Sequence, residues 1–87
     1  SFIFIKMYYV YILYSRTKDR YYVGYTHNIE IRLSKHNAGA TPSTRGGRPW
    51  ELVYSEEYID KSSALFRERE IKSKKSRKYI EHLVAKG

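Results

Sequence analysis

The sequence contains no cysteine and only nine acidic residues, against 17 Lys and Arg, among 87 residues. The absence of cysteine excludes disulfides, thiolate metal sites and thiol nucleophiles. Phosphate-loop, dinucleotide-binding and H-E-x-x-H motifs are missing as well, which removes the enzyme classes that depend on them. The shortage of acid leaves a net charge of +8. On so small a chain this favours a polyanionic partner, with nucleic acid ahead of acidic lipid.

Long apolar runs are also missing, since no segment approaches the roughly 18 residues that a membrane span requires. We therefore expect no membrane partner and a cytoplasmic location. The apolar start, SFIFIK, is shorter than a signal peptide. We interpret residues 1–6 as a leader or tag remnant before Met7, and residues 7–87 as a single domain.

Aromatic and β-branched residues are abundant, with ten tyrosines in the chain. The run at 8–14, YYVYILY, predicts a buried central strand, and YYVGYT at 21–26 predicts a second strand. The polar residues 16–20 between them indicate the turn of a β-hairpin. Residues 50–57, WELVYSEE, alternate as in a half-buried third strand. Its apolar face is predicted to carry Trp50, Leu52 and Tyr54.

Capping residues mark the predicted helices. Asn28 is a suitable N-cap for a helix that should end near Ala38-Gly39, before an irregular loop at 39–49. Asp60 is a suitable N-cap for a helical region that the basic run 72–78 can interrupt. The resulting order, β-β-α-β-α(α), predicts the α+β class, a small three-stranded antiparallel sheet flanked by helices.

The second strand combines Tyr22 with Gly24 on one face. A glycine two residues from a tyrosine leaves open space beside the phenol, where a ligand can approach. The alternative is a β-bulge at Gly24 with core tyrosines, and for this feature alone that alternative is the better one.

The first helix places Arg32 and His36 four residues apart, beside the Ile29 and Leu33 stripe that should face the sheet. A guanidinium and an imidazole at that edge can bind a phosphate. An arginine that extends to solvent, with a histidine bonded to backbone, explains the pattern equally well.

Glu68 falls between Leu65 and Ile71 on the inward arc of its helix. A buried carboxylate is unfavourable unless it is paired or holds a cation. A divalent metal and an ion pair with Arg32 are equally supported alternatives.

Basic residues are concentrated in the loop and near the end of the chain. Such a run is often only a solvated surface, but with this net charge it favours contact with a phosphate backbone. The predicted nucleic-acid-binding residues are Arg45, Arg48, Lys72, Lys74, Lys75, Arg77 and Lys78.

Together these residues resemble a known family. Tyr-Val-Tyr at 9–11 and Tyr-Val-Gly at 22–24 resemble the paired motif of the GIY-YIG nucleases, and Arg32, His36 and Glu68 follow in the family's order. The similarity extends from about residue 7 to residue 79. It is strongest with the small stand-alone bacterial branch, which is similar to the N-terminal nuclease domain of excinuclease C and the catalytic domain of Slx-type structure-specific nucleases.

The resemblance implies a divalent-metal-dependent endonuclease that hydrolyses phosphodiester bonds, in DNA ahead of RNA, in repair or processing. It implies roles for five residues: Tyr11 and Tyr22 as the motif tyrosines, Arg32 as the phosphate-binding arginine, His36 as the histidine of part of the family, and Glu68 as the carboxylate for one Mg²⁺ or Mn²⁺ ion. There are two departures. Tyr9 replaces the first motif's glycine, and Tyr25 stands where excinuclease C has a lysine.

Two other functions fit the same sequence. One is a non-catalytic module that clamps nucleic acid, with Tyr9 or Tyr14 stacking on bases. The other is a nuclease subunit that is active only with a protein partner. A homodimer is a further option for so small a domain.

Overall fold

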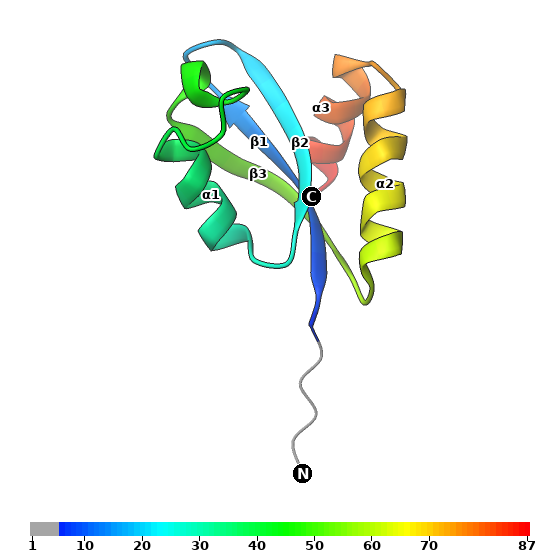
Figure 1. The fold of residues 1–87 in the computed structure, drawn as a ribbon. Helices are drawn as coiled ribbons and strands as arrows, with labels where there is room; N and C mark the ends of the chain where they lie inside the picture. Colours follow the sequence, from blue (N-terminus) through cyan, green and yellow to red (C-terminus); the bar gives the residue numbers. More distant parts are fainter. Residues whose placement is uncertain (1–5) are drawn as a thin grey trace.

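Three strands form one antiparallel sheet in the order β2-β1-β3 (Figure 1). They are β1 (Tyr8–Ser15), β2 (Arg20–Thr26) and β3 (Trp50–Tyr58). The computed structural model describes residues 6–87, so the leader proposed at residues 1–6 lies, apart from Lys6, outside the described residues. The dense apolar run occupies the centre of the sheet, as predicted, and both the hairpin and the third strand are confirmed.

Helices cover both faces of the sheet (Figure 1). Helix α1 (Ile29–Asn37) lies on one face, and α2 (Lys61–Ser73) with α3 (Arg77–Lys86) lies on the other. A short 3₁₀ helix, η1 (Arg45–Gly47), lies within the irregular loop. The α+β class and the β-β-α-β-α(α) order are thereby confirmed. None of the helices in residues 6–87 is long and apolar enough to cross a bilayer.

The helix ends follow the predicted capping residues. The Asn28 side chain accepts a hydrogen bond from the Ile31 N–H, and the Asp60 side chain accepts one from the Ser63 N–H. Gly39 follows the end of α1 with a φ of 81°, a left-handed conformation that glycine adopts without strain. The basic run does interrupt the helical region, because α2 ends at Ser73 and α3 begins at Arg77.

The two faces of β1 build two separate cores, because side chains alternate along a strand. On the α2/α3 face the buried residues are Val10, Ile12, Val23, Ala64, Ile71 and Leu83. On the α1 face they are Tyr11, Leu13 and Trp50, with Tyr22, Ile29 and Leu33 packed against them. The α1 face is therefore the aromatic side of the sheet.

The prediction that Trp50, Leu52 and Tyr54 share one face is wrong. The β1–β3 register shifts between Ile12 and Leu13, which pair with Tyr54 and Leu52 respectively. The one extra residue in β3 moves the side chains that follow it to the opposite face. Trp50 consequently packs on the α1 side, Tyr54 packs on the α2/α3 side, and Leu52 is 41% exposed.

Arg67 fixes the rotation of α2 against β3. Its Nε donates to Glu56 Oε1 at 2.9 Å, and its Nη1 donates to Glu70 at 2.7 Å and to the Tyr79 hydroxyl at 3.0 Å. Successive helical residues point about 100° apart, so the next side chain, Glu68, is directed away from β3. This arrangement turns Glu68 toward the β2 side of the sheet.

Candidate active site

Strand β2 lies at an edge of the sheet, with α1 on one side and α2 on the other (Figure 1). Within residues 6–87, β2 pairs only with β1, so its outer edge carries no further strand. Tyr22 and Gly24 belong to this edge strand, opposite Leu13 and Tyr11. Side chains from both flanking helices can therefore meet along β2.

Gly24 accommodates Tyr11. The two residues are directly paired across β1 and β2, and a Cβ at Gly24 would lie 2.5 Å from the Tyr11 hydroxyl oxygen. The space was predicted to be open floor beside Tyr22, but the Tyr11 phenol fills it. The β1–β2 register continues through Gly24, so the residue is not a bulge. Its missing side chain lets the Tyr11 hydroxyl reach the edge of the sheet.

The Tyr11 hydroxyl lies at one end of a buried hydrogen-bond chain. It is 3.0 Å from His36 Nε2, and His36 Nδ1 is 2.8 Å from the Thr44 hydroxyl, which itself donates to the Thr41 carbonyl. Because the Thr44 hydrogen is committed to Thr41, we assign the ring proton of His36 to Nδ1. The Nε2 atom then accepts the Tyr11 hydrogen.

These hydrogen bonds give His36 a role that was not expected from the sequence. Of the two alternatives for His36, phosphate binding at the surface and a hydrogen bond to backbone, neither describes this arrangement: the residue is 1% exposed and its ring nitrogens bond to the side chains of Tyr11 and Thr44. It holds the Tyr11 phenol in place. The sequence offered no local signal for the hydrogen bonds of His36, because Tyr11 lies 25 positions away and Thr44 lies in the irregular loop.

Burial and charge shift the pKa values of this pair in opposite directions. Burial raises the pKa of Tyr11 far above its ordinary value, and Tyr22 and Glu68 add to the increase while Arg32 opposes it. Burial also lowers the pKa of His36, and the positive charge of Arg32 lowers it further. Tyr11 and His36 therefore both favour the neutral form, which the hydrogen bond between them requires.

We expect His36 to stay neutral at pH values where an ordinary histidine becomes protonated. An unfolded histidine has a pKa of about 6.5, whereas the folded value is lower. Between the two values the unfolded chain binds more protons, so stability falls as the pH drops below about 6.5. An NMR titration of the imidazole, assigned with His36→Gln, measures the shift directly. A His36 signal that titrates at 6.5 or higher contradicts the assignment, as does an equally steep loss of stability in His36→Gln.

Tyr22 is the more accessible of the two motif tyrosines. It is half-buried, with its ring centroid 5.0 Å from His36 and 6.3 Å from Tyr11. The ammonium of Lys72 lies 5.8 Å from the centre of the Tyr22 ring. A cation in this position stabilises negative charge that develops on the phenol.

Glu68 is buried on the inward side of α2, as predicted. The predicted alternative of an ion pair with Arg32 does not occur among residues 6–87; the Glu68 carboxylate instead lies 3.2 Å from the Lys72 ammonium. The i,i+4 spacing of Glu68 and Lys72 was the available signal for this pair. Lys72 was predicted to contact a phosphate backbone. Its ammonium instead lies between the Glu68 carboxylate and the Tyr22 ring.

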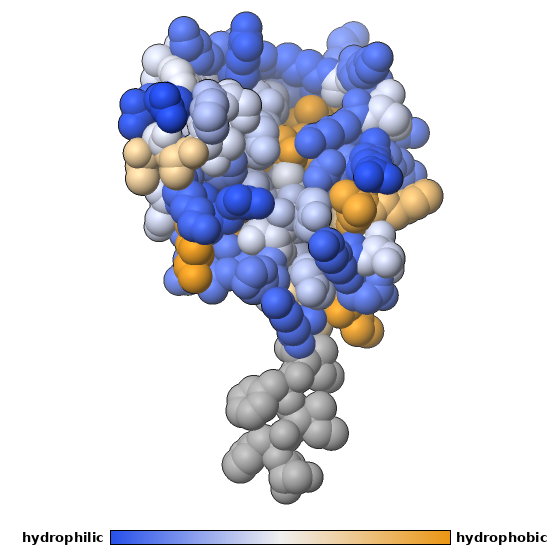
Figure 2. All heavy atoms as spheres, in the orientation of Figure 1, coloured by the Kyte–Doolittle hydropathy of each residue, from blue (hydrophilic) through white to orange (hydrophobic). Residues whose placement is uncertain are grey.

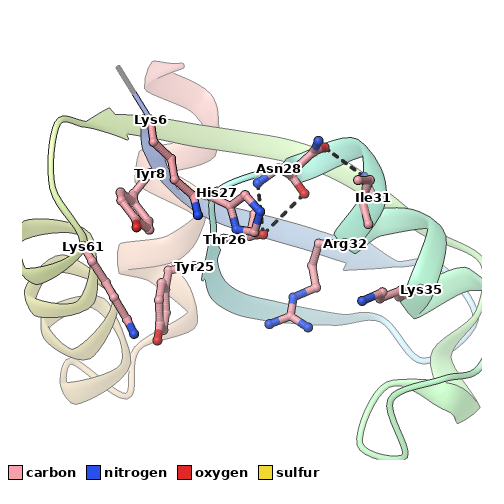
Figure 3. Close-up of a pocket in the computed structure, with 10 residues that line it drawn as sticks. All are labelled: Lys6, Tyr8, Tyr25, Thr26, His27, Asn28, Ile31, Arg32, Lys35 and Lys61. Carbon is pink, nitrogen blue, oxygen red and sulfur yellow. Dashed lines mark hydrogen bonds between the residues drawn. The ribbon is translucent and has the colours of Figure 1, made fainter. Parts of the chain in front are cut away.

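Arg32 is exposed on α1, where it lines a cavity beside Lys35 and Lys61 (Figure 3). Its charge acts on the pKa of both Tyr11 and His36, and Glu68 also acts on Tyr11. The structure thus brings Tyr11, Tyr22, Arg32, His36 and Glu68 together around the middle of β2, although they are spread over 58 positions of the sequence from 11 to 68.

The donor set around Glu68 fits a weakly held hard cation. Among residues 6–87 there is no cluster of three His, Cys, Asp or Glu that could enclose a metal ion. A single carboxylate suits Mg²⁺ or Mn²⁺, since such ions keep several waters and take further oxygens from a substrate phosphate. The Lys72 side chain is 50% exposed, so it can move aside and release the carboxylate.

The remaining basic residues divide into two groups. In the loop, Arg45 Nε donates to the Gly39 carbonyl at 2.9 Å and Arg48 Nε donates to the Arg45 carbonyl at 2.7 Å. Near the break between α2 and α3, Arg77 pairs with Asp19 and Glu81. The side chains of Lys74, Lys75 and Lys78 are exposed in this second region.

Known proteins match most of the length of this chain. Residues 7–80 match the family model of the GIY-YIG catalytic domain. A UPF0213 protein of Natronomonas pharaonis is 49% identical over 78 residues, covering 88% of this chain and 89% of that protein. A UPF0213 protein of Staphylococcus haemolyticus is 48% identical over 67 residues, covering 75% and 79%. The solution NMR structure of a UPF0213 protein from Bacillus halodurans is similar with a TM-score of 0.58 and 36% identity, covering 91% of this chain and 83% of that one.

Proposed function

The chain belongs to the GIY-YIG family, and from this premise we propose that it is a divalent-metal-dependent endonuclease that hydrolyses phosphodiester bonds in DNA, in repair or processing. One observation carries the proposal. Two phenols, a guanidinium and a buried acid lie around β2, whose outer edge pairs with no further strand within residues 6–87. Membership supports the endonuclease class, and the proposed metal dependence and DNA substrate rest on the chemistry of these groups.

Glu68 would hold the Mg²⁺ or Mn²⁺ ion. When bound, such an ion supplies Lewis-acid stabilisation of charge on the phosphoryl and leaving oxygens. A single carboxylate would need oxygens from the substrate beside it to hold such an ion, so metal binding would depend on bound DNA. Lys72 neutralises Glu68 in the free protein and keeps the buried carboxylate compatible with the fold.

Tyr22 is the proposed general base. Tyr22 first loses its phenol proton to solvent. Water then attacks the phosphorus in line and gives a proton to the Tyr22 oxygen, while the bond from phosphorus to the leaving deoxyribose oxygen breaks. That oxygen takes a proton from solvent, and no covalent intermediate forms. A free phenol has a pKa of about 10 and is a poor base near neutrality. The ammonium of Lys72, 5.8 Å from the centre of the Tyr22 ring, is the cation that lies nearest to hand for this step.

Tyr11 and Arg32 have different tasks in this scheme. The Tyr11 hydroxyl donates to His36 and has a raised pKa, so it is unsuited to accept the proton from water. It acts as a fixed neutral group beside the reacting phosphate. Arg32, exposed on α1, stabilises the charge of the pentavalent transition state. The predicted backbone-binding residues, Arg45 and Arg48 among them, would add affinity without sequence specificity.

A substrate panel tests the proposal. The purified full chain is incubated with single-stranded, flap, branched and duplex DNA, and with matching RNA, in Mg²⁺, Mn²⁺ or chelator. We expect cutting of DNA that requires either metal. Binding without cutting in every condition would favour the non-catalytic module, and cutting that appears only after a protein partner is added would favour the subunit.

A further inference from the structure

The charged residues that line the cavity beside Arg32 are all positive. Ten residues line about 340 Å³ of space between α1 and the start of α2, and none of them is acidic. Four are cations: Lys6, Arg32, Lys35 and Lys61. In Figure 3 Arg32 and Lys35 extend from α1 on one side, and Lys61 lies across the space beside Tyr25. Segments far apart in the chain therefore direct like charges at one cavity.

These charges are not compensated by the protein. Within the part of the chain that the structure describes, Lys6, Arg32, Lys35 and Lys61 form no ion pair with a carboxylate. All four are exposed. Like charges around one cavity repel each other, and this repulsion is relieved by a multivalent anion. The cavity thus favours a ligand that carries several negative charges along its length.

The cavity is continuous with the proposed catalytic centre along β2. Arg32 belongs to both, and the β2 residues Tyr25 and Thr26 line the cavity. Three residues back along the strand, Tyr22 lines two further cavities together with Arg20. At about 3.3 Å per strand residue, Tyr22 and Tyr25 lie about 10 Å apart along β2. Measured along the axis of a DNA duplex, at 3.4 Å for each nucleotide of a strand, this distance corresponds to about three nucleotides.

Figure 2 shows the same arrangement on the surface. A strip of intermediate hydropathy lies over β2, and hydrophilic side chains lie on both sides of it, over α1 and over α2. A polyanionic strand laid along this strip meets cations on both flanks. It also passes the edge of the sheet where Tyr22 is accessible.

We propose that this cavity is a phosphate subsite, which holds the backbone on one side of the scissile bond within about three nucleotides of it. Lys35 and Lys61 contact the phosphates from opposite sides, and Arg32 connects the subsite to the reacting phosphate. The inference rests on the proposed function for the position of the scissile bond, but not for binding itself. None of these contacts involves a base, so the subsite sets register and affinity and does not read sequence.

Salt-dependent binding tests the subsite without any cutting. Fluorescence anisotropy with a labelled single-stranded DNA in chelator gives the slope of log affinity against log salt. Each of Lys35→Ala and Lys61→Ala should weaken binding roughly three- to tenfold and reduce the slope by about 0.7. The double variant should reduce the slope by about twice as much as either single variant. Lys86→Ala, which removes an exposed cation at the end of α3, is the matched control and should leave the slope unchanged.

A methylphosphonate scan then locates the subsite. Replacing single phosphates by the uncharged analogue should weaken binding by the wild-type protein at positions within about three nucleotides of the mapped cut, on one side only. At those positions the Lys35→Ala, Lys61→Ala double variant should lose no further affinity. An unchanged salt slope in the double variant, or an equal loss in Lys86→Ala, overturns the subsite. If the expected slopes appear but the protein never cuts DNA, the proposed nuclease function fails and the subsite stands.

Discussion

Glu68→Gln should lower the rate of metal-dependent DNA cleavage by about 10³-fold or more, and DNA affinity should be retained. The substitution keeps the shape of the side chain but removes the carboxylate charge that is proposed to hold the metal ion. Losing several kcal/mol of charge stabilisation in the transition state corresponds to a change of this size. Removing one negative charge from a basic surface does not weaken the binding of a polyanion.

The rate is measured under single-turnover conditions, and DNA binding is measured separately in chelator. Paramagnetic broadening of amide signals near residue 68 by Mn²⁺ provides a readout independent of activity, and Glu68→Gln should remove it. Glu51→Gln is the matched control, since it makes the same change at an exposed position of β3. Cleavage at the wild-type rate by Glu68→Gln would show that the metal assignment is wrong.

Tyr22→Phe should lower the cleavage rate by about 10²- to 10⁴-fold, the range expected for loss of a general base. The ring remains, so its packing against His36 and Trp50 and the Lys72 contact are preserved. The melting temperature should therefore change little. The rate is measured under single-turnover conditions, with the melting temperature as the control for folding.

Tyr11→Phe is the informative counterpart. It removes the donor to His36 and leaves a buried ring nitrogen unpaired, which costs about 1–3 kcal/mol of stability. The comparison therefore separates the roles of the two phenols. Tyr22→Phe should lower the cleavage rate and leave the stability nearly unchanged, whereas Tyr11→Phe should lower the stability. A Tyr22→Phe protein that cuts at the wild-type rate, with the rate lost in a folded Tyr11→Phe protein, would reverse the assignment of the base.

Much of the fold is encoded in short-range signals. Asn28 and Asp60 each place an oxygen where an unpaired helix N–H needs it, so two helix starts were predictable from single residues. The run at 8–14 contains enough aromatic and β-branched residues to identify the central strand from the sequence. The inward direction of Glu68 followed from helical periodicity alone, because its neighbours Leu65 and Ile71 define the covered face.

What the sequence did not predict depends on contacts between distant segments. The shift of register opposite Ile12 and Leu13 is a property of two paired strands, and the alternation of residues 50–57 does not predict it. The hydrogen bond between Tyr11 and His36 joins residues 25 positions apart. The cavity between Lys35 and Lys61 exists only once α1 and α2 flank the same strand. In each case the local pattern fits several partners, and only packing selects one.

The open edge of β2 has a consequence for the molecule in isolation. A strand with unpaired backbone groups can recruit the edge of another molecule, and many proteins prevent this by adding a strand or a cover. Here a cover would block access to Tyr22, and we expect electrostatic repulsion between the cation-lined edges of two copies to oppose such pairing. The charges that attract DNA should therefore also protect against aggregation, and variants that remove many of them should become less soluble as well as bind more weakly.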